Sequence, residues 1–417
     1  MTARCLLAVA WVALALAPRE GAAADITILD RPGAVHRETP PSASPAQPGF
    51  SLIPPAQAAS RGPSGSAATV PALRLTGVIE VGDAAKLEQA IGRLSRSTAI
   101  RPDTPLTAIE LSSMGGSLFD GIAIGRLLKK HRMVAVVRQR DFCLSSCALA
   151  FLGGNEPDVP TAYPTRCNLE LGAKVAFHNF FLNPQLLRPT TATDAVESRL
   201  QGFSDARGGA ASLVRYAADL GLPPSFAASL MGRPIDDFQY IETVGQFLKF
   251  GVCPIGLARP SVALEQQALN ACRNSTDEDA PAQLQARLLP AQYVKRYLLE
   301  RVQATMQASR ARGRLAGLLA SGAVMRVPEE IDRLYEDLRA AGMALPDIVG
   351  PTYEILGEER GSLQVTCYVS LSPDDSEIFD VVVSSERGLA FPPRDPPDKA
   401  RKLFLYDRNT IINPRPR

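Results

Sequence analysis

Two serines lie between two cysteines in the segment DFCLSSCALAFLGG, residues 141–154. A serine hydroxyl at the start of a helix can attack an acyl carbon when a base takes its proton, and the helix N-terminus favours negative charge. The same serine can instead be an ordinary N-cap. The thiols of Cys143 and Cys147 are a third candidate, but the sequence shows nothing that would lower a thiol pKa. Ser145 and Ser146 are therefore candidates whose role depends on what lies beside them.

Two other features could complete such a site. The segment SSMGGSL places Gly115 and Gly116 between a predicted strand and a predicted helix, where glycines let backbone amides approach a ligand. The pair could also serve only a tight turn. His178 ends a later predicted strand and could act as a base, or be a hydrogen-bonded core histidine. His131 ends a basic helix and is expected at the surface.

The elements that must position these residues alternate between strand and helix. Helices are predicted after Asp83, over LFDGIAIGRLLKKH and over SSCALAFLGG. This order is typical of parallel βα units, whose strand ends meet at one edge of the sheet. The predicted strands are LRLTGVIE, LTAIELSS, MVAVVR and AKVAFHNF.

The N-terminal region carries a targeting signal. Arg4 precedes a short apolar run, and GAAAD offers a small-residue cleavage site near Ala24, so residues 1–24 are predicted to be a secretory signal peptide. An uncleaved membrane anchor is the alternative, although the run is short for a membrane span. Residues 25–70 are rich in Pro, Ala, Ser and Gly and are predicted to be a disordered linker. No other segment is long and apolar enough to span a bilayer.

If the chain is exported, its cysteines can form disulfides. Removing Cys5 leaves six of the seven cysteines, an even number that an oxidising compartment permits to form disulfides. Cys143 and Cys147 are one helical turn apart, within disulfide range, and Cys167 competes for either. We expect at least one of Cys143 and Cys147 to be oxidised.

The sequence predicts an α/β domain that is followed by a smaller C-terminal region. The α/β domain is predicted over residues 71–275, with helical patterns at about 191–220 and 223–250. Residues 285–417 are predicted to form a small α+β region of unknown function, helical first and then alternating as strands.

Four quoted segments together resemble the Clp-type serine proteases of the Clp protease/crotonase superfamily. They are GVIEVGDAAKLEQAI, ELSSMGGSLFDGIAIGRLLKK, VVRQRDFCLSSCALAFLGG and VAFHNF, and the resemblance as a whole covers about residues 75–255. Within the superfamily they most resemble an exported bacterial branch with a Cys-x-Ser-x-Cys nucleophile segment. The 29 residues from Gly116 to Ser145 fit the family spacing from oxyanion glycine to nucleophile without insertion.

The resemblance implies a ββα superhelix and a role for each candidate. Ser145 would be the nucleophile and His178 the general base, while the amides of Gly116 and Ser146 would hold the oxyanion. Asp236 aligns best as the acid that orients the histidine, with Asp237 second and a helix cap as the alternative.

The expected function is that of an exported serine hydrolase, a peptidase acting on a peptide or protein substrate in the periplasm or outside the cell. It would need no cofactor and no metal, and related proteases form rings, so a homo-oligomer is allowed. The net charge of +2, with no basic patch, gives no reason to expect nucleic acid as a partner. A catalytically inactive binding or assembly module is the main alternative. An acyl-CoA enzyme is disfavoured because export removes the chain from acyl-CoA.

Overall fold

The computed structural model divides the chain into two compact units. Unit one comprises Met1–Pro157 and Phe177–Asp237, and unit two comprises Asp158–Ala176 and Phe238–Arg417. The structure therefore does not divide at residue 275. The described residues are 23–29, 72–97, 108–154, 167–179, 192–234, 236–276, 283–290, 350–359, 362–376, 379–384, 390–391 and 400–415, with single positions at 294, 333 and 340.

The described part of unit one contains a mixed sheet in the order β1-β2-β3-β4. Leu73 and Leu75 of β2 and Ile109 and Leu111 of β3 are fully buried, which explains why these segments form central strands. Strand β1 runs antiparallel to β2, and the others run parallel. The strands are β1 (Asp25–Leu29), β2 (Ala72–Thr76), β3 (Ala108–Ser112) and β4 (Val134–Val137).

Strand β1 corrects the prediction of a linker that begins at residue 25. Asp25–Leu29 pair with Thr76–Ala72 along the whole of β2. The sequence DITIL carries β-branched residues that favour a strand, and averaging composition over 25–70 concealed them. The rest of the predicted linker and most of the predicted signal peptide lie outside the described residues.

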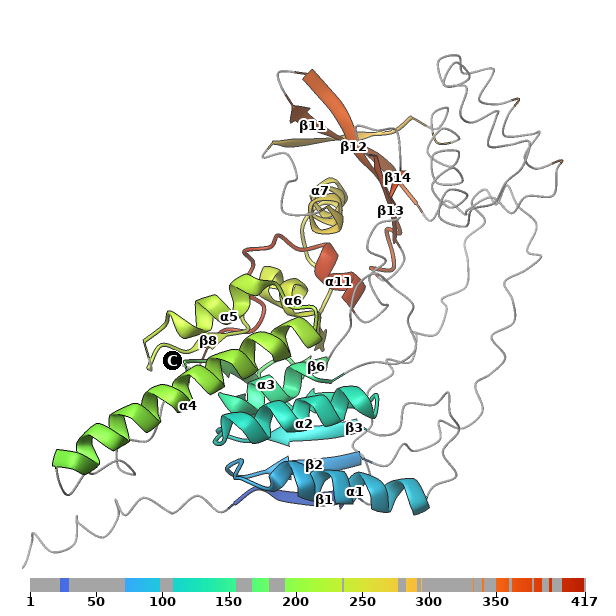
Figure 1. Cartoon of the computed structure of the whole chain (residues 1–417). Coiled ribbons are helices and arrows are strands. Elements are labelled where there is room, and N and C mark those ends of the chain that lie inside the picture. Colours follow the sequence, from blue (N-terminus) through green and yellow to red (C-terminus); the bar gives the residue numbers. More distant parts are fainter. Residues whose placement is uncertain are drawn as a thin grey trace, which may run out of the picture. The chain divides into compact units, whose positions relative to one another are not determined.

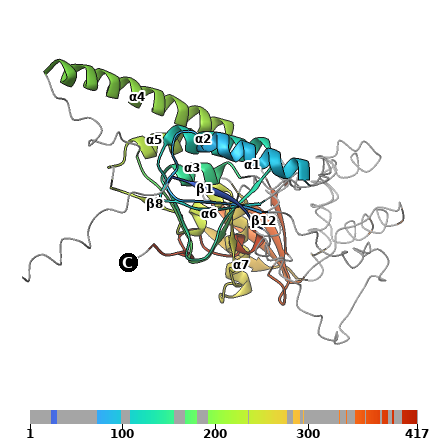
Figure 2. The same ribbon diagram turned by 90° about the horizontal axis from the view of Figure 1, so that it is seen from below.

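Helices cover one face of this sheet and continue into a helical layer. Figures 1 and 2 show α1 (Asp83–Ser97) and α2 (Leu118–Lys130) beside the strands, as the alternation predicted. Helix α2 contacts both α3 (Ser146–Leu152) and α4 (Ala192–Asp219). The chain is therefore a mixed α/β protein. Within the described residues, no helix is long and apolar enough to cross a membrane.

A network of ion pairs connects charged side chains of β2 and β3 with the chain that follows β4. Glu110, which is only 6% exposed, accepts from Arg74 at 2.8 Å and from Arg138 at 2.7 Å. Arg74 also pairs with Asp141 at 2.9 Å, and Ser112 donates to the same carboxylate at 3.0 Å. Two arginines and two carboxylates balance in charge, and their mutual attraction offsets part of the cost of removing them from water. The network fixes the turn that leads into β5 (Phe142–Leu144).

Unit two contains a strand pair and an antiparallel sheet backed by a helix. Strand β6 (Cys167–Glu170) runs parallel to β9 (Val252–Ile255). Helix α7 (Leu264–Ser275) packs against the antiparallel sheet β10-β11-β12-β13-β14, and a disulfide joins Cys272 to Cys367. The α+β character predicted for the end of the chain agrees with this sheet. Its strands are Leu284–Leu288, Thr352–Glu359, Ser362–Leu371, Phe379–Ser384 and Ala390–Phe391.

Several short strands and helices complete the two units. Strand β7 (Lys174–Phe177) carries the chain out of unit two, and β8 (Gln239–Tyr240) follows its return. The remaining helices are α5 (Pro224–Met231) in unit one and α6 (Val244–Phe250) and α11 (Arg401–Phe404) in unit two. The helical part predicted at the beginning of residues 285–417 lies outside the described residues, apart from isolated positions.

Candidate active site

Ser145 occupies a sharp turn between strand β5 and helix α3. Its backbone has φ 56° and ψ −124°, which lies outside the left-handed helical region that non-glycine residues occasionally adopt. Conformations of this kind cost about 1–3 kcal/mol and persist only where the surroundings impose them. Here the imposing contacts are backbone hydrogen bonds between Ser113 and its neighbours in β5, at 2.8 Å to Phe142 and 3.0 Å from Leu144.

The hydroxyl of Ser145 does not cap the helix. Ser145 stands at the N-cap position of α3, but its side chain makes no capping hydrogen bond. In contrast, the N-cap serine of α2, Ser117, accepts from the amide of Asp120 and donates to the carboxylate of the same residue. The interpretation of Ser145 as an ordinary N-cap is therefore not supported, and its half-buried hydroxyl is free of that structural task.

Gly115 lies directly against this turn. A Cβ atom on Gly115 would be 2.6 Å from the Cβ of Ser145 and 2.7 Å from the carbonyl oxygen of Leu144. Its φ of 97° also favours glycine. Sequence reasoning assigned the oxyanion role to Gly116 and missed that Gly115 is the residue in contact with Ser145. The glycine pair is thus more than a tight turn, because it permits a close approach between two loops.

Two backbone amides near Ser145 have no acceptor among the residues that the structure describes. Ile79 donates to the carbonyl of Gly115 at 2.8 Å and accepts from Ser117 at 2.7 Å. This parallel bridge leaves the N–H of Gly116, which lies between those two residues, pointing away from Ile79. Neither that N–H nor the N–H of Ser146, at the first turn of α3, has an acceptor among the described residues. Both are suited to stabilise negative charge.

The second serine has no comparable access. Ser146 is 2% exposed, and its Oγ is buried without a hydrogen-bond partner in the described structure. A Cβ on Gly121 of α2 would be 2.5 Å from the Ser146 carbonyl oxygen, so the two helices pack very closely here. Tyr216 of α4 holds the next turn of α3 by donating to the carbonyl of Leu149 at 2.8 Å. Of the two serines, Ser146 is therefore buried, whereas Ser145 is half-buried.

A disulfide brackets Ser145. Cys143 and Cys147 are joined, with their Cα atoms 5.1 Å apart, and both are fully buried. The expectation that at least one of them is oxidised agrees with this bond, which joins the two cysteines to each other. Because both sulfurs are in a disulfide, neither cysteine offers the thiol that the third candidate nucleophile required.

The candidate base, His178, and the candidate acid, Asp236, both lie in unit one. The ring of Phe177 packs edge-on against Phe226 of α5, with centroids 5.5 Å apart. Asn179 donates to the carbonyls of Met231 and Arg233, both at 3.1 Å. The chain on both sides of His178 is therefore attached to α5 and to the turn that follows it. That turn leads to Asp236 three residues later.

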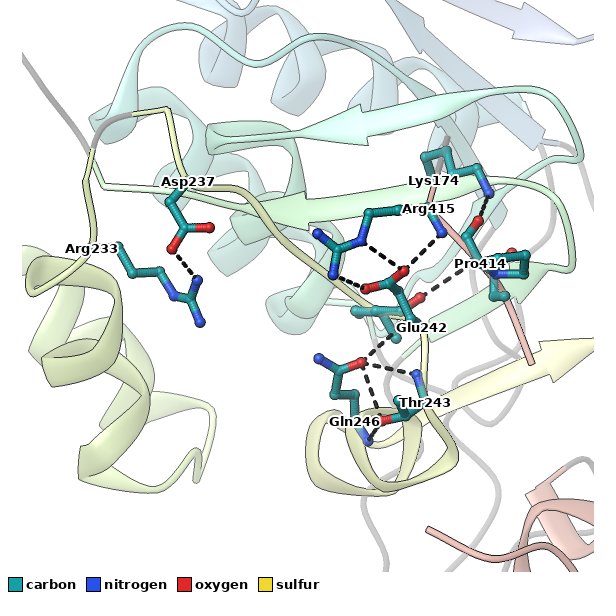
Figure 3. A network of polar contacts seen from close by, with 10 residues as sticks. Lys174, Arg233, Asp237, Glu242, Thr243, Gln246, Pro414 and Arg415 are labelled. Carbon is teal, nitrogen blue, oxygen red and sulfur yellow. Dashed lines mark hydrogen bonds and ion pairs between the residues drawn. The ribbon is translucent and has the colours of Figure 1, made fainter. Parts of the chain in front are cut away.

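The two candidate acids differ in their contacts. Asp237 is held by Arg233 of the preceding turn at 2.6 Å (Figure 3). Asp236 is exposed and has no ion pair among the described residues. Ser145 thus lies beside Gly115 and Ser146, whereas the residues on either side of His178 contact α5 and the turn that precedes Asp236. The role of each as part of a single triad stays a prediction.

His131 is less exposed than the sequence predicted. It is half-buried at the C-cap of α2, and its Nε2 is buried without a partner in the described residues. Burial lowers the pKa of this imidazole below its usual value of 6.5, and the positive charge of Lys130 lowers it further. The carboxylate of Glu88 opposes both effects. His131 therefore favours its neutral form.

Comparisons with known proteins found a weak structural similarity. No family model matches this chain, and no curated protein matches it. Among the solved structures that match is a mutant of the 1510-N membrane-bound stomatin-specific protease, with 12% sequence identity and a TM-score of 0.29. The match covers 44% of this chain and 77% of that one. A likeness at this level is not evidence for a shared fold or activity.

Proposed function

We propose that this chain is an exported serine hydrolase that cleaves peptide bonds, with a ClpP/crotonase-like ββα superhelix. The observation that carries the proposal is the backbone of Ser145. A strained, non-glycine residue lies at a strand-to-helix turn, its hydroxyl does not cap the helix, and two backbone amides without an acceptor among the described residues lie near it. A turn of this kind presents a serine Oγ to a substrate in serine hydrolases of other folds.

The chemistry follows the roles that the resemblance implies. Ser145 Oγ attacks the acyl carbon of the scissile bond as His178 takes its proton, and the amides of Gly116 and Ser146 stabilise the oxyanion. Each such donor contributes about 3 kcal/mol to the transition state. The proton passes from His178 to the departing amine nitrogen, and water then hydrolyses the acyl ester. Asp236 orients the imidazole, since Asp237 is held by Arg233.

The compartment forms part of the proposal. Two disulfides, Cys143–Cys147 and Cys272–Cys367, are typical of proteins from oxidising compartments. Together with the signal-like N-terminus, they support a protein that works in the periplasm or outside the cell on a peptide or protein substrate.

Hydrolysis of an unfolded protein tests the proposal. Reduced, alkylated casein should be cleaved by the purified wild type and not by Ser145→Ala, with new peptide ends identified by mass spectrometry. Ser146→Ala is the matched control, because it removes the neighbouring hydroxyl and keeps the backbone amide, so it should retain activity. If the wild type and Ser145→Ala are equally inactive on casein and on a fluorophosphonate probe, the chain is a binding or assembly module instead.

A further inference from the structure

Residues 408–415, here called the strap, run back across unit two. The amides of Val244 and Gly245, at the start of α6, donate to strap carbonyls at 3.0 Å and 2.8 Å. Thr243 forms an antiparallel bridge with Ile411. The strap then continues over the loop before β7, more than 200 residues away in the sequence (Figure 3).

A single buried amide joins three segments of the chain. Asn413 is 2% exposed, and its Oδ1 accepts from the N–H of Gly172 at 2.9 Å. Its Nδ2 donates to the carbonyl of Ala173 at 2.9 Å and to that of Ile241 at 3.4 Å. Side chains that satisfy several buried backbone groups at once fix the relative position of those segments.

Charged contacts reinforce the same place. Glu242, whose side chain is 13% exposed, accepts from the backbone N–H of Arg415 at 2.8 Å and pairs with its guanidinium at 3.1 Å. The carbonyl of Glu242 accepts from the amides of Ile412 and Asn413. Lys174, the first residue of β7, donates to the carbonyl of Pro414. Burial lowers the pKa of Lys174, and the charge of Glu242 opposes that shift.

The strapped segments lead directly to the proposed base and acid. The chain leaves unit two after Ala176, and His178 is the second residue beyond that crossing. It returns at Phe238, and Asp236 is the second residue before that crossing. Ile241 donates to the carbonyl of Val175 at 3.0 Å, so the two segments are also hydrogen-bonded to each other.

We propose that the strap is a positioning element of the hydrolase, and that Asn413 and the Glu242–Arg415 pair set the geometry of His178 and Asp236. This inference rests on the proposed function. None of these residues touches the substrate: they act through the chain that carries the base and the acid. A shift of about 1 Å at a reacting group can reduce a rate by about 100-fold, so modest loosening here has a large effect.

The test compares labelling rates of the full chain with a fluorophosphonate probe. Asn413→Ala should slow labelling by about 10- to 100-fold and alter its pH profile, because the orientation of the base changes. Asn409→Ala is the matched control, since Asn409 lies in the same strap with an exposed side chain, and it should label like the wild type. Melting temperatures show whether each variant is folded at the assay temperature.

A milder variant keeps the test decisive if Asn413→Ala does not fold. Arg415 is exposed, so Arg415→Ala should fold normally and still slow labelling several-fold. Folded variants that label at the wild-type rate, with an unchanged pH profile, would reduce the strap to a structural feature and overturn the inference. If the wild type is not labelled at all, the proposed function itself fails, and the inference fails with it.

Discussion

Gly115 offers the sharpest perturbation of the proposed site. In Gly115→Ala the new Cβ would lie 2.6 Å from the Cβ of Ser145, whereas carbon atoms pack at about 3.5–4.0 Å. Ser145 or the glycine loop must therefore move by about 1 Å. Positive φ costs an alanine about 1–2 kcal/mol, and overpacking typically adds about 1–3 kcal/mol. We expect a stability loss of about 2–5 kcal/mol.

The same displacement should reduce reactivity. A misplacement of about 1 Å costs about 100-fold in rate, so fluorophosphonate labelling of the folded variant should fall by about that factor. Gly82→Ala is the matched control: Gly82 has φ 99°, and a Cβ added to it would have no atom within 4 Å. It should lose only the backbone contribution of about 1–2 kcal/mol and keep the wild-type labelling rate.

Urea unfolding and the labelling rate together test the contact of Gly115 with Ser145 and the role of Ser145 as the nucleophile. If Gly115→Ala is destabilised no more than Gly82→Ala, the close approach of Gly115 to Ser145 is not what excludes a side chain there. If Gly115→Ala is folded and labelled at the wild-type rate, Ser145 is not the nucleophile that this turn presents.

Three further predictions rest on the same contacts. Ser145→Gly and Ser145→Ala should both be inactive. In urea unfolding, the glycine variant should be more stable than the alanine variant by about 1 kcal/mol, because glycine relieves backbone strain of about 1–3 kcal/mol and loses about 0.5–1 kcal/mol to chain entropy. Asp236→Asn should slow labelling, whereas Asp237→Asn should cost only an exposed ion pair of at most about 1 kcal/mol and leave the rate unchanged; the reverse result would reassign the acid. The lowered pKa of His131 means that the unfolded chain binds a proton more readily, so stability should fall as pH drops below 6.5. His131→Gln should lessen that fall on going from neutral to mildly acidic pH, and an unchanged pH dependence would refute this assignment.

The sequence predicted those features that have local causes. Strand β4 is an apolar run, β2 and β3 carry buried apolar residues on either side of one charged residue, and the amphipathic pattern of α2 with its terminal lysines matches the observed helix. The disulfide between Cys143 and Cys147 joins residues one turn apart, so spacing alone made it plausible. Strand β1 was missed because five residues are too few to change the composition of a long Pro-rich stretch.

Contacts between residues that are far apart in the chain leave no recognisable pattern in the sequence. The contact of Gly115 with Ser145 depends on two loops approaching each other, and the resemblance pointed to Gly116 alone. Asn413 binds Gly172 across 241 positions, and neither residue has a neighbour that predicts the other. Such contacts are specified only when the whole chain has folded.

Locating the covalent adduct tests the central claim most directly. Wild-type protein treated with a fluorophosphonate should gain the mass of one phosphonyl group, and tandem mass spectrometry of the peptide containing residues 141–154 should place that group on Ser145. An adduct on Ser146 or on a residue outside this segment, or no adduct on folded protein, would contradict the assignment of Ser145 as the nucleophile.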